Sequence, residues 1–348
     1  MSLHPSMDDH PHPPASLSLW RAAWVALLLL AGSAAQAQVD FTAYGIADFS
    51  YGRFEPSGAL PSNRFNSNSL SASFAGANLK YGLDGGWTPG LTLETFVRFQ
   101  DLRTGRKDED PLLSRNAFVS LASPYGLLRV GRLQTPLFDV TSRFNAFGPS
   151  PAFSPAVRHV YASGNLEGVQ RDFLWNRAVA YTSPSIEGVT ANVMASQLPQ
   201  GESGRLVGGS VVVAQGLLGL SIAGQRLKSN DGIVDPTSET TWQIGATYNF
   251  GIARVFTQVT ATQDDGLDVR SRTGSAGVSW AVGPGNVLAQ VAQTTATGPA
   301  VDRKHTSKSL GYVYPYDSEL DLYLLGMDDR VRDQTRGLSV ALGGRWRF

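Results

Sequence analysis

Residues 337–348 read GLSVALGGRWRF, and their side chains alternate between two kinds. Successive residues of a β-strand point to opposite faces of a sheet. As a strand, this stretch has one apolar face, formed by Leu338, Val340, Leu342, Gly344, Trp346 and Phe348. Its other face is small or charged and consists of Ser339, Ala341, Gly343, Arg345 and Arg347. The same alternation recurs in 241–250 and 273–282, whereas helical spacing is not sustained between 38 and 348. The sequence therefore predicts an all-β protein.

Short turn-forming sequences alternate with longer polar stretches along the chain. The turns include 84–86 and 283–285, and the polar stretches include 101–112, 263–271 and 297–306. This pattern is typical of antiparallel strands in a meander whose two ends face different environments. We predict sixteen strands, and eighteen stays open as an alternative. The predicted strands are 41–52, 69–81, 91–101, 113–122, 126–134, 176–183, 188–197, 205–214, 217–227, 240–250, 252–262, 271–282, 286–296, 307–315, 319–328 and 335–348.

A sheet of this size with one apolar face is stable when that face contacts lipid and when the sheet closes into a barrel so that its edges are paired. An open sheet would leave unpaired edges, and in lipid every backbone N–H and C=O must be paired, which a closed barrel achieves. Aromatic residues such as Tyr51, Trp242 and Trp280 lie at strand ends, as in the two interfacial girdles of membrane barrels. The prediction is a transmembrane antiparallel β-barrel.

The N-terminal region has the three parts of a secretory signal peptide. A basic residue, Arg21, precedes the apolar run 22–31, and the small-residue sequence AQA follows at 35–37. The apolar run is too short for a membrane-spanning helix, which needs about 20 residues. We predict a leader over 1–37 and a β-barrel domain over 38–348.

Composition excludes several classes of function. The chain has 29 basic and 29 acidic residues and no Cys, so neither nucleic-acid binding nor a thiol or Cys-ligated metal site is expected. Beyond the leader only His159 and His305 remain as histidines, no G-x-S-x-G motif occurs, and His305 is expected in a solvated loop. We predict no enzymatic activity, no cofactor and no metal.

Several motifs resemble those of the Gram-negative general porins. RNAFVSLA at 115–122, GLLRVGR at 126–132 and TPLFD at 135–139 are similar to the fourth and fifth strands of that family and the start of its third extracellular loop. YGIAD at 44–48 resembles the opening strand, and RWRF at 345–348 resembles the terminal strand. The resemblance covers essentially all of 38–348.

The resemblance implies a trimeric channel of the Gram-negative outer membrane for passive diffusion of small hydrophilic solutes and ions. Phe348 would be the signal that the insertion machinery reads, and outer-membrane lipids with lipopolysaccharide would surround the barrel. Small residues near the seam between the first and last strands suit a subunit contact and equally suit lipid: Ala43, Gly45, Ala47, Leu342 and Gly344.

The segment 135–175 has no clear strand signal, and segments of that length are usually functional or disordered. In the family this third loop folds inward and narrows the lumen, and the aromatic residues Phe138, Phe144, Phe147 and Phe153 favour ordered packing. A mobile external loop is the alternative. The loop's candidate pore residues are Asp139, Arg158, Glu167 and Asp172.

In the family an arginine ladder on the wall faces the acidic groups of the loop. RAVAYTSPS at 177–185 resembles the strand that follows the third loop in the family. By motif position Arg115 and Arg177 match two ladder members. Arg132 is a third candidate, and Arg129 on the opposite strand face competes for that role. A further ladder position holds Ser71, and Arg98 could replace it.

The remaining lumen candidates are Asp48 and Glu94. The loop has three acidic residues and three arginines, so we predict a weak anion preference. A substrate-specific channel with a saturable site is the alternative, and each arginine could also have no effect on selectivity.

Overall fold

The computed structural model describes residues 39–161, 172–197, 203–230 and 237–348. The predicted leader, 1–37, and Glu167 lie outside the described residues. The strands are β1 (Val39–Phe54), β2 (Ser62–Asn66), β3 (Phe74–Tyr81), β4 (Thr88–Arg98), β5 (Arg103–Thr104), β6 (Ala117–Ser123), β7 (Gly126–Gln134), β8 (Leu174–Thr182), β9 (Val189–Gln197), β10 (Ser203–Gln215), β11 (Leu218–Asn230), β12 (Thr237–Asn249), β13 (Ala253–Asp264), β14 (Val269–Val282), β15 (Gly285–Gly298), β16 (Val301–Pro315), β17 (Leu320–Val331) and β18 (Gly337–Arg347). The helices are η2 (Asp84–Gly86), α2 (Pro136–Arg143) and α3 (Pro155–Tyr161).

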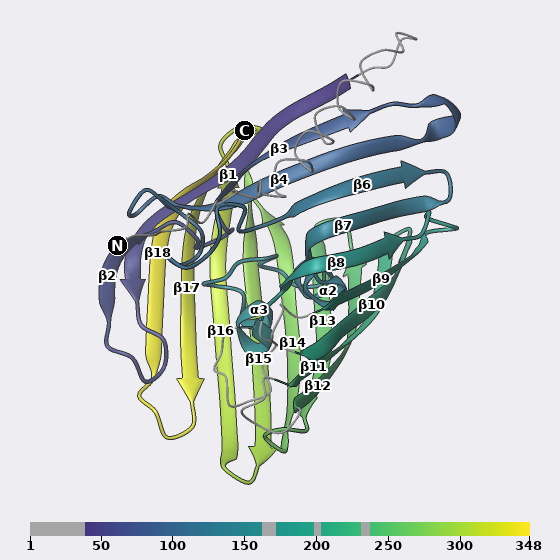
Figure 1. Cartoon of the computed structure of the whole chain (residues 1–348). Helices are drawn as coiled ribbons and strands as arrows, with labels where there is room; N and C mark the ends of the chain where they lie inside the picture. The colour runs from purple at the N-terminus through teal and green to yellow at the C-terminus, as the bar shows by residue number, and fades with distance from the viewer. Residues whose placement is uncertain (1–38, 162–171, 198–202, 231–236) are drawn as a thin grey trace, which may run out of the picture. The chain divides into compact units, whose positions relative to one another are not determined.

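These strands form one antiparallel sheet that closes on itself, because β1 pairs with β18 (Figure 1). β2 and β3 both pair with β1 and are two parts of one barrel strand. β5 is a two-residue pairing on the end of β4, beside its main partner β6. The eighteen strand segments therefore make a barrel of sixteen strands, and the predicted fold is confirmed.

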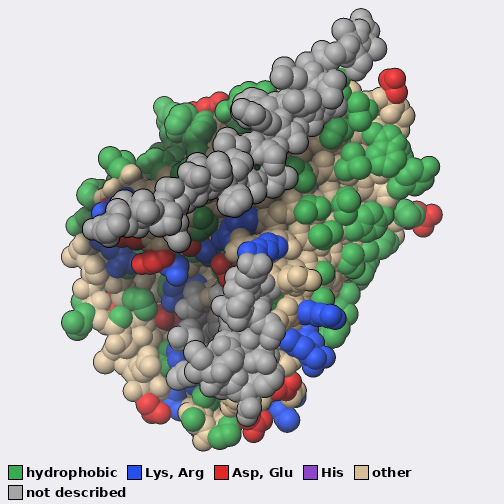
Figure 2. Space-filling model, viewed as in Figure 1, with side chains coloured by type: hydrophobic (Ala, Val, Ile, Leu, Met, Phe, Trp, Pro, Cys, Tyr) green, Lys and Arg blue, Asp and Glu red, His purple; other side chains and the backbone are tan. Residues whose placement is uncertain are grey.

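The two faces of the sheet differ as the sequence pattern predicts. Large apolar side chains such as Val211, Ile244 and Leu324 are exposed on the outer wall, whereas Thr260 and Gln290 on the inner wall are buried. In the view of Figure 2, hydrophobic side chains cover the outer wall at the upper right, and many charged ones lie toward the opening. Burial on the inner wall requires something inside the barrel, because an empty water-filled lumen would leave these side chains exposed.

The segment that follows β7 lies inside the barrel and covers these inner-wall side chains. Helix α2 contacts β9 to β12 and helix α3 contacts β14 to β16, and both lie within the ring of strands in Figure 1. The four aromatic residues of this segment, Phe138, Phe144, Phe147 and Phe153, are all buried. The segment 135–161 is therefore packed in an ordered manner against the inner wall.

The predicted strand 69–81 is wrong at its start, because residues 67–73 do not pair as a strand. The carboxylate of Asp48 in β1 accepts backbone hydrogen bonds from Ser69 (2.9 Å), Leu70 (3.2 Å) and Ser71 (2.9 Å). The carboxylate oxygens satisfy these three N–H groups in place of carbonyl oxygens of a neighbouring strand. The chain thus leaves the ladder between β2 and β3 and returns to it at Phe74.

Several strands are longer than predicted. β14 begins at Val269 and β16 at Val301, within stretches that the sequence indicated as polar loops. His305 is consequently a strand residue with only 2% of its surface exposed, and the expectation of a solvated loop is wrong. Polar residues on the inner wall give a strand the composition of a loop, which accounts for the error.

Candidate pore constriction

Helix α2 is held against the inner wall by hydrogen bonds. The hydroxyl of Thr135 accepts a bond from the backbone N–H of Phe138 (3.3 Å) and caps the helix, and Pro136 follows at the first helical position, as is common at helix starts. The side-chain amide of Gln243 in β12 donates to the hydroxyl of Thr141 (3.0 Å), and that of Gln258 in β13 donates to its carbonyl oxygen (2.9 Å).

Helix α3 is fixed to a different part of the wall. The imidazole of His159 forms hydrogen bonds with the hydroxyls of Thr294 (2.7 Å) and Ser307 (2.9 Å) and stacks on the ring of His305, with 4.0 Å between centroids. His305 bonds to Asp329 of β17 (2.7 Å), and Arg158 lies 3.6 Å from the same carboxylate. The segment between β7 and β8 therefore has contacts on the wall from β9 to β17.

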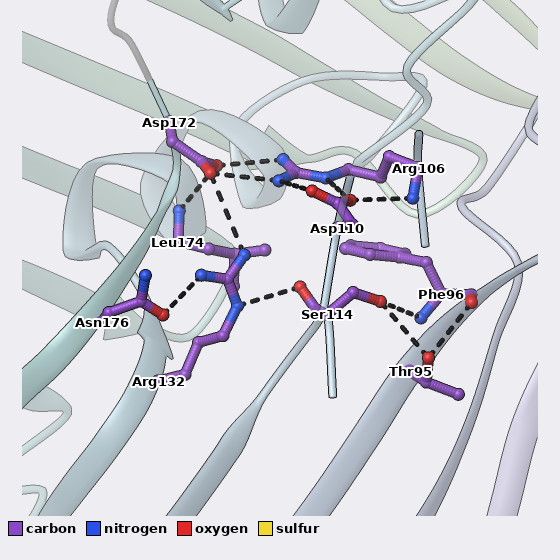
Figure 3. Close-up of polar contacts among 9 residues, drawn as sticks. All are labelled: Thr95, Phe96, Arg106, Asp110, Ser114, Arg132, Asp172, Leu174 and Asn176. Carbon is purple, nitrogen blue, oxygen red and sulfur yellow. Dashed lines mark hydrogen bonds and ion pairs between the residues drawn. The ribbon is translucent and has the colours of Figure 1, made fainter. Parts of the chain in front are cut away.

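Figure 3 shows a third contact, where the connection between β4 and β6 meets the start of β8. The guanidinium of Arg106 forms bidentate hydrogen bonds with Asp172 (3.0 and 3.1 Å) and with Asp110 (3.0 and 3.4 Å). It also lies over the rings of Phe96 and Phe173, at 5.5 and 5.4 Å from their centroids. Burial opposes ionisation of Asp110, but the hydrogen bonds from Arg106 hold its pKa below the usual value.

Arg132 links this network to the barrel wall. Its guanidinium donates to the carbonyl oxygen of Ser114 (2.9 Å) and to the side chain of Asn176 (2.7 Å), and it lies 3.9 Å from the Asp172 carboxylate. The structure thus brings together Arg132 and Asp172, two residues that the sequence singled out. Arg106 and Asp110 are not among the residues predicted from the sequence, in which their i, i+4 spacing within a polar stretch is the signal that points to an ion pair.

Glu94 and Arg115 form another pair on the inner wall. Arg115 donates to the Glu94 carboxylate, which also accepts bonds from the Tyr44 hydroxyl (2.5 Å) and the Asn116 amide (2.6 Å). The Arg115 guanidinium lies 3.9 Å from the centroid of the Phe74 ring. The Glu94 charge is therefore neutralised locally, by one of the predicted ladder arginines.

The other predicted site residues lie apart from these clusters. Arg98 pairs with Asp101 (3.6 Å) and Asp108 in the connection after β4. Arg177 is exposed, has a positive φ of 50°, and sits opposite the irregular pairing between Gly131 and Leu133. Asp48 is 0% exposed, because its carboxylate is covered by the backbone of residues 69–71, so it is not in contact with water of the lumen.

Asp139 lies between two arginines. A cavity of about 380 Å³ is lined by Asp139 and Arg143 of α2, by Arg129 of β7 and by polar residues of the wall such as Thr182 and Asn192. Burial raises the pKa of Asp139 to about 6, while the positive charges of Arg129 and Arg143 oppose this rise. Two cations therefore face a single carboxyl group in this cavity, and that group loses its charge below about pH 6.

Among the described residues, no helix is long and apolar enough to cross a membrane. The same part of the chain holds no group of three or more His, Asp or Glu side chains positioned to bind a metal ion.

Comparison with known proteins gives the class of the molecule. A sequence profile of the Gram-negative porin family matches residues 23–334, and the chain belongs to that family. It is therefore an outer-membrane β-barrel channel. A search of curated protein sequences gave no significant match.

Solved structures show the same fold. The chain is similar to the anion-selective porin from Comamonas acidovorans, with a TM-score of 0.77, 22% sequence identity, and coverage of 89% of this chain and 100% of that chain. OmpT of Vibrio cholerae has a TM-score of 0.69 at 14% identity, with coverage of 91% and 99%. OmpF of Salmonella typhi in complex with daunomycin has a TM-score of 0.64 at 14% identity, with coverage of 88% and 97%.

The Arg106 network gives a first testable expectation. Arg106→Ala removes the cation that both Asp110 and Asp172 depend on, so we expect the free energy of unfolding to fall by about 1–3 kcal/mol. Arg103→Ala is the matched control, because Arg103 forms a single ion pair with Asp108 in which both side chains are more than half exposed, and such pairs contribute little. Urea titration of the detergent-folded protein measures both, and equal stability of the two variants would contradict the assigned role.

Proposed function

We propose that this porin forms a water-filled channel for passive diffusion of small hydrophilic solutes and ions, with a weak anion preference, and that the segment 135–161 narrows its lumen. The observation that carries the anion preference is the pairing of charges on the inner wall. Glu94, Asp321 and Asp329 each bond to at least one arginine of the described chain. Their negative charge is therefore locally cancelled.

Cations remain in excess on the same surface. Within the described part of the chain, Arg129 and Arg143 both lie beside the one carboxyl of Asp139. Arg254 of β13 donates to the hydroxyl of Thr247 and has no acidic partner among the same residues. Field lines focus in a narrow aqueous lumen with low-dielectric walls, so a small excess of fixed charge biases ion traffic. A porin with a similar fold is described as anion-selective, which is consistent with a preference for anions in this channel.

Further parts of the proposal concern assembly. Residues 1–37 act as a cleaved leader, Phe348 is read by the insertion machinery, and lipopolysaccharide surrounds the outer wall. The assembly is a homotrimer in which the small outward residues near the β1–β18 seam contact a second copy, and one structurally similar porin, OmpT, is described in a trimer form. Diffusion through the channel requires no catalytic group and no cofactor.

Reversal potentials in planar bilayers test the proposed function. With a tenfold KCl gradient across the membrane, we expect a potential displaced modestly toward the chloride equilibrium value. A clear displacement toward the potassium value would contradict the anion preference. Conductance that rises linearly with salt supports free diffusion, whereas saturation at low solute concentration would favour a substrate-specific channel.

Asp139 makes the selectivity depend on pH. Because its pKa is raised to about 6, the carboxylate is ionised at pH 7.5 and largely protonated at pH 5. Protonation removes a negative charge from beside Arg129 and Arg143, so the anion preference should increase at pH 5. Asp139→Asn should show the higher preference at both pH values. A variant with the same pH dependence as the native chain would exclude Asp139 as the titrating group.

A further inference from the structure

The two histidines of residues 38–348 stack on each other at the contact between α3 and the inner wall. The rings of His159 on α3 and His305 on β16 have centroids 4.0 Å apart and planes 15° from parallel. Both side chains are buried, with 2% of their surface exposed. An apolar pair could fill the same space, whereas each imidazole can also take up a proton near neutral pH.

The hydrogen bonds around His159 fit a neutral ring. The hydroxyl of Ser307 donates to the Asp329 carboxylate, so it accepts a hydrogen bond from Nε2 of His159 (2.9 Å). In the neutral ring Nδ1 accepts from the Thr294 hydroxyl (2.7 Å), which lies 2.7 Å from the hydroxyl of Thr273. A proton on Nδ1 would require the Thr294 hydroxyl to turn from donor to acceptor.

Charged groups from α3, β16 and β17 surround the pair. Asp329 of β17 accepts a hydrogen bond from Nε2 of His305 (2.7 Å), and Arg158 of α3 lies 3.6 Å from the same carboxylate. The positive charges of Arg158 and of Arg303 on β16 oppose a proton on His159. The negative charge of Asp329 favours one. Protonation of both rings would place two further positive charges beside the two guanidinium groups.

A proton on His159 is therefore more favourable when the ring is away from the wall. Burial and the neighbouring His305 hold the pKa of His159 well below its usual value, whereas a solvated imidazole has a pKa of about 6.5. The state with α3 on the wall is therefore favoured above about pH 6.5. Below that pH each unit favours the released state about tenfold, until the ring on the wall is itself protonated.

Helix α3 depends on wall contacts for its position. It has seven residues, and isolated helices shorter than about 12–15 residues are marginal in water. The segment is held separately on both sides of α3, by the bond from Gln258 to the end of α2 and by the bonds from Arg106 to Asp172. Release of α3 would therefore displace the middle of the segment and leave its two ends on the wall.

We propose that His159 and His305 form a proton-operated latch that positions α3. The neutral rings hold the helix on β14 to β16, and proton uptake by the pair releases it toward the axis of the lumen and lowers the conductance. The latch rests on the proposed narrowing of the lumen by 135–161, but it requires no particular ion selectivity. His159 acts through the position of α3 and does not itself bind the permeating solute.

The test records single-channel currents of the detergent-folded protein in planar bilayers from pH 7.5 to pH 4.5 at one KCl concentration. For the native chain we expect the ratio of closed to open time to rise at least tenfold between pH 6.5 and pH 4.5. His159→Gln keeps a donor and an acceptor but takes up no proton, so its ratio should change less than twofold. An equal rise in both proteins would overturn the latch.

Three further variants separate the latch from other effects. His305→Gln leaves His159 in place and should give an intermediate rise. Asp139→Asn removes the titrating carboxyl of α2, and Gln258→Leu loosens α2 without removing a titratable group, so both should retain the full rise. Loss of the rise in either would overturn the assignment to the histidines. Absence of channels at pH 7.5 would contradict the proposed function, whereas channels that are equally steady at every pH would overturn the latch alone.

Hydrogen–deuterium exchange tests whether α3 is the part that moves. After correction for the intrinsic pH dependence of exchange, we expect the protection of the amides in 155–161 to fall at least tenfold between pH 6.5 and pH 4.5 in the native chain. Protection should be unchanged in His159→Gln and in the strand amides 271–280 of both proteins. Full protection of α3 at a pH where the native conductance has fallen would place the closure elsewhere and overturn the proposal.

Discussion

Reversing two lumen cations should change the ion preference of the channel from anions to cations. Arg143 at the end of α2 and Arg254 on β13 are exposed, and among the described residues neither forms an ion pair with an acidic side chain. Arg143→Glu with Arg254→Glu replaces two positive charges by two negative ones. Glu94, Asp321 and Asp329 keep their own arginine partners, and Asp139 keeps Arg129 beside it, so this change shifts the net charge of the lumen.

The measured quantity is the reversal potential in a tenfold KCl gradient. We expect it to change sign at about 0.1 M salt, where the Debye length is about 10 Å, and to move back toward zero at about 1 M, where it is about 3 Å. Arg205→Glu with Lys228→Glu makes the same charge change on the outer wall and should leave the potential unaltered. An unchanged sign in the lumen variant would exclude these two arginines from the selectivity of the pore.

Asp48→Ala should be the most destabilising single substitution in the first strand. The Asp48 carboxylate accepts three backbone N–H groups from 69–71 and the Tyr323 hydroxyl (2.8 Å), with none of its surface exposed. Alanine leaves these four buried donors without an acceptor. At about 1–3 kcal/mol for each unsatisfied group, with partial relaxation, we expect a loss of roughly 4–6 kcal/mol in the free energy of unfolding.

Asp40→Ala is the control for this prediction. Asp40 lies on the same strand, is exposed and faces Lys80 across the sheet, so its removal should have little effect on stability. Asp48→Asn should fall between the two, because its amide has only one acceptor oxygen. Urea titration monitored by the heat-resistant compact band on gels measures all three, and a stable Asp48→Ala protein would show that 67–73 is held by other contacts.

The barrel itself could be predicted because its physics is local. An apolar side chain such as Leu342 or Trp346 is favourable in contact with lipid, whereas its neighbour Arg345 is favourable in contact with water. Because successive side chains of a strand point to opposite faces, one face of each strand can contact lipid and the other can contact water. Closure then follows from the absence of hydrogen-bonding partners in lipid. Prediction of the barrel therefore does not require knowledge of which side chains, far apart in the sequence, are in contact.

The interior of the barrel could be predicted only in part, because it depends on contacts between side chains that are far apart in the sequence. The sequence indicated that Arg132 and Asp172 belong to the pore region, but their common partner Arg106 comes from a loop whose path no local pattern specifies. Asp48 occupies the position of a lumen residue in the strand pattern, yet it binds the backbone of another segment. His305 appeared to be a loop residue because its neighbours are Lys and Thr, and only packing against His159 makes that composition part of a buried strand.

The β1–β18 pairing has a consequence for the order of biogenesis. Gly45 and Phe348 exchange backbone hydrogen bonds in both directions, at 2.9 and 3.2 Å, so residues near the two extremes of the described chain are hydrogen-bonded partners. The ring of strands is complete only when β18 has docked on β1. Until then both margins of the nascent sheet expose unsatisfied peptide groups, and a shortened polypeptide would keep them exposed, as a substrate for chaperones and periplasmic proteases.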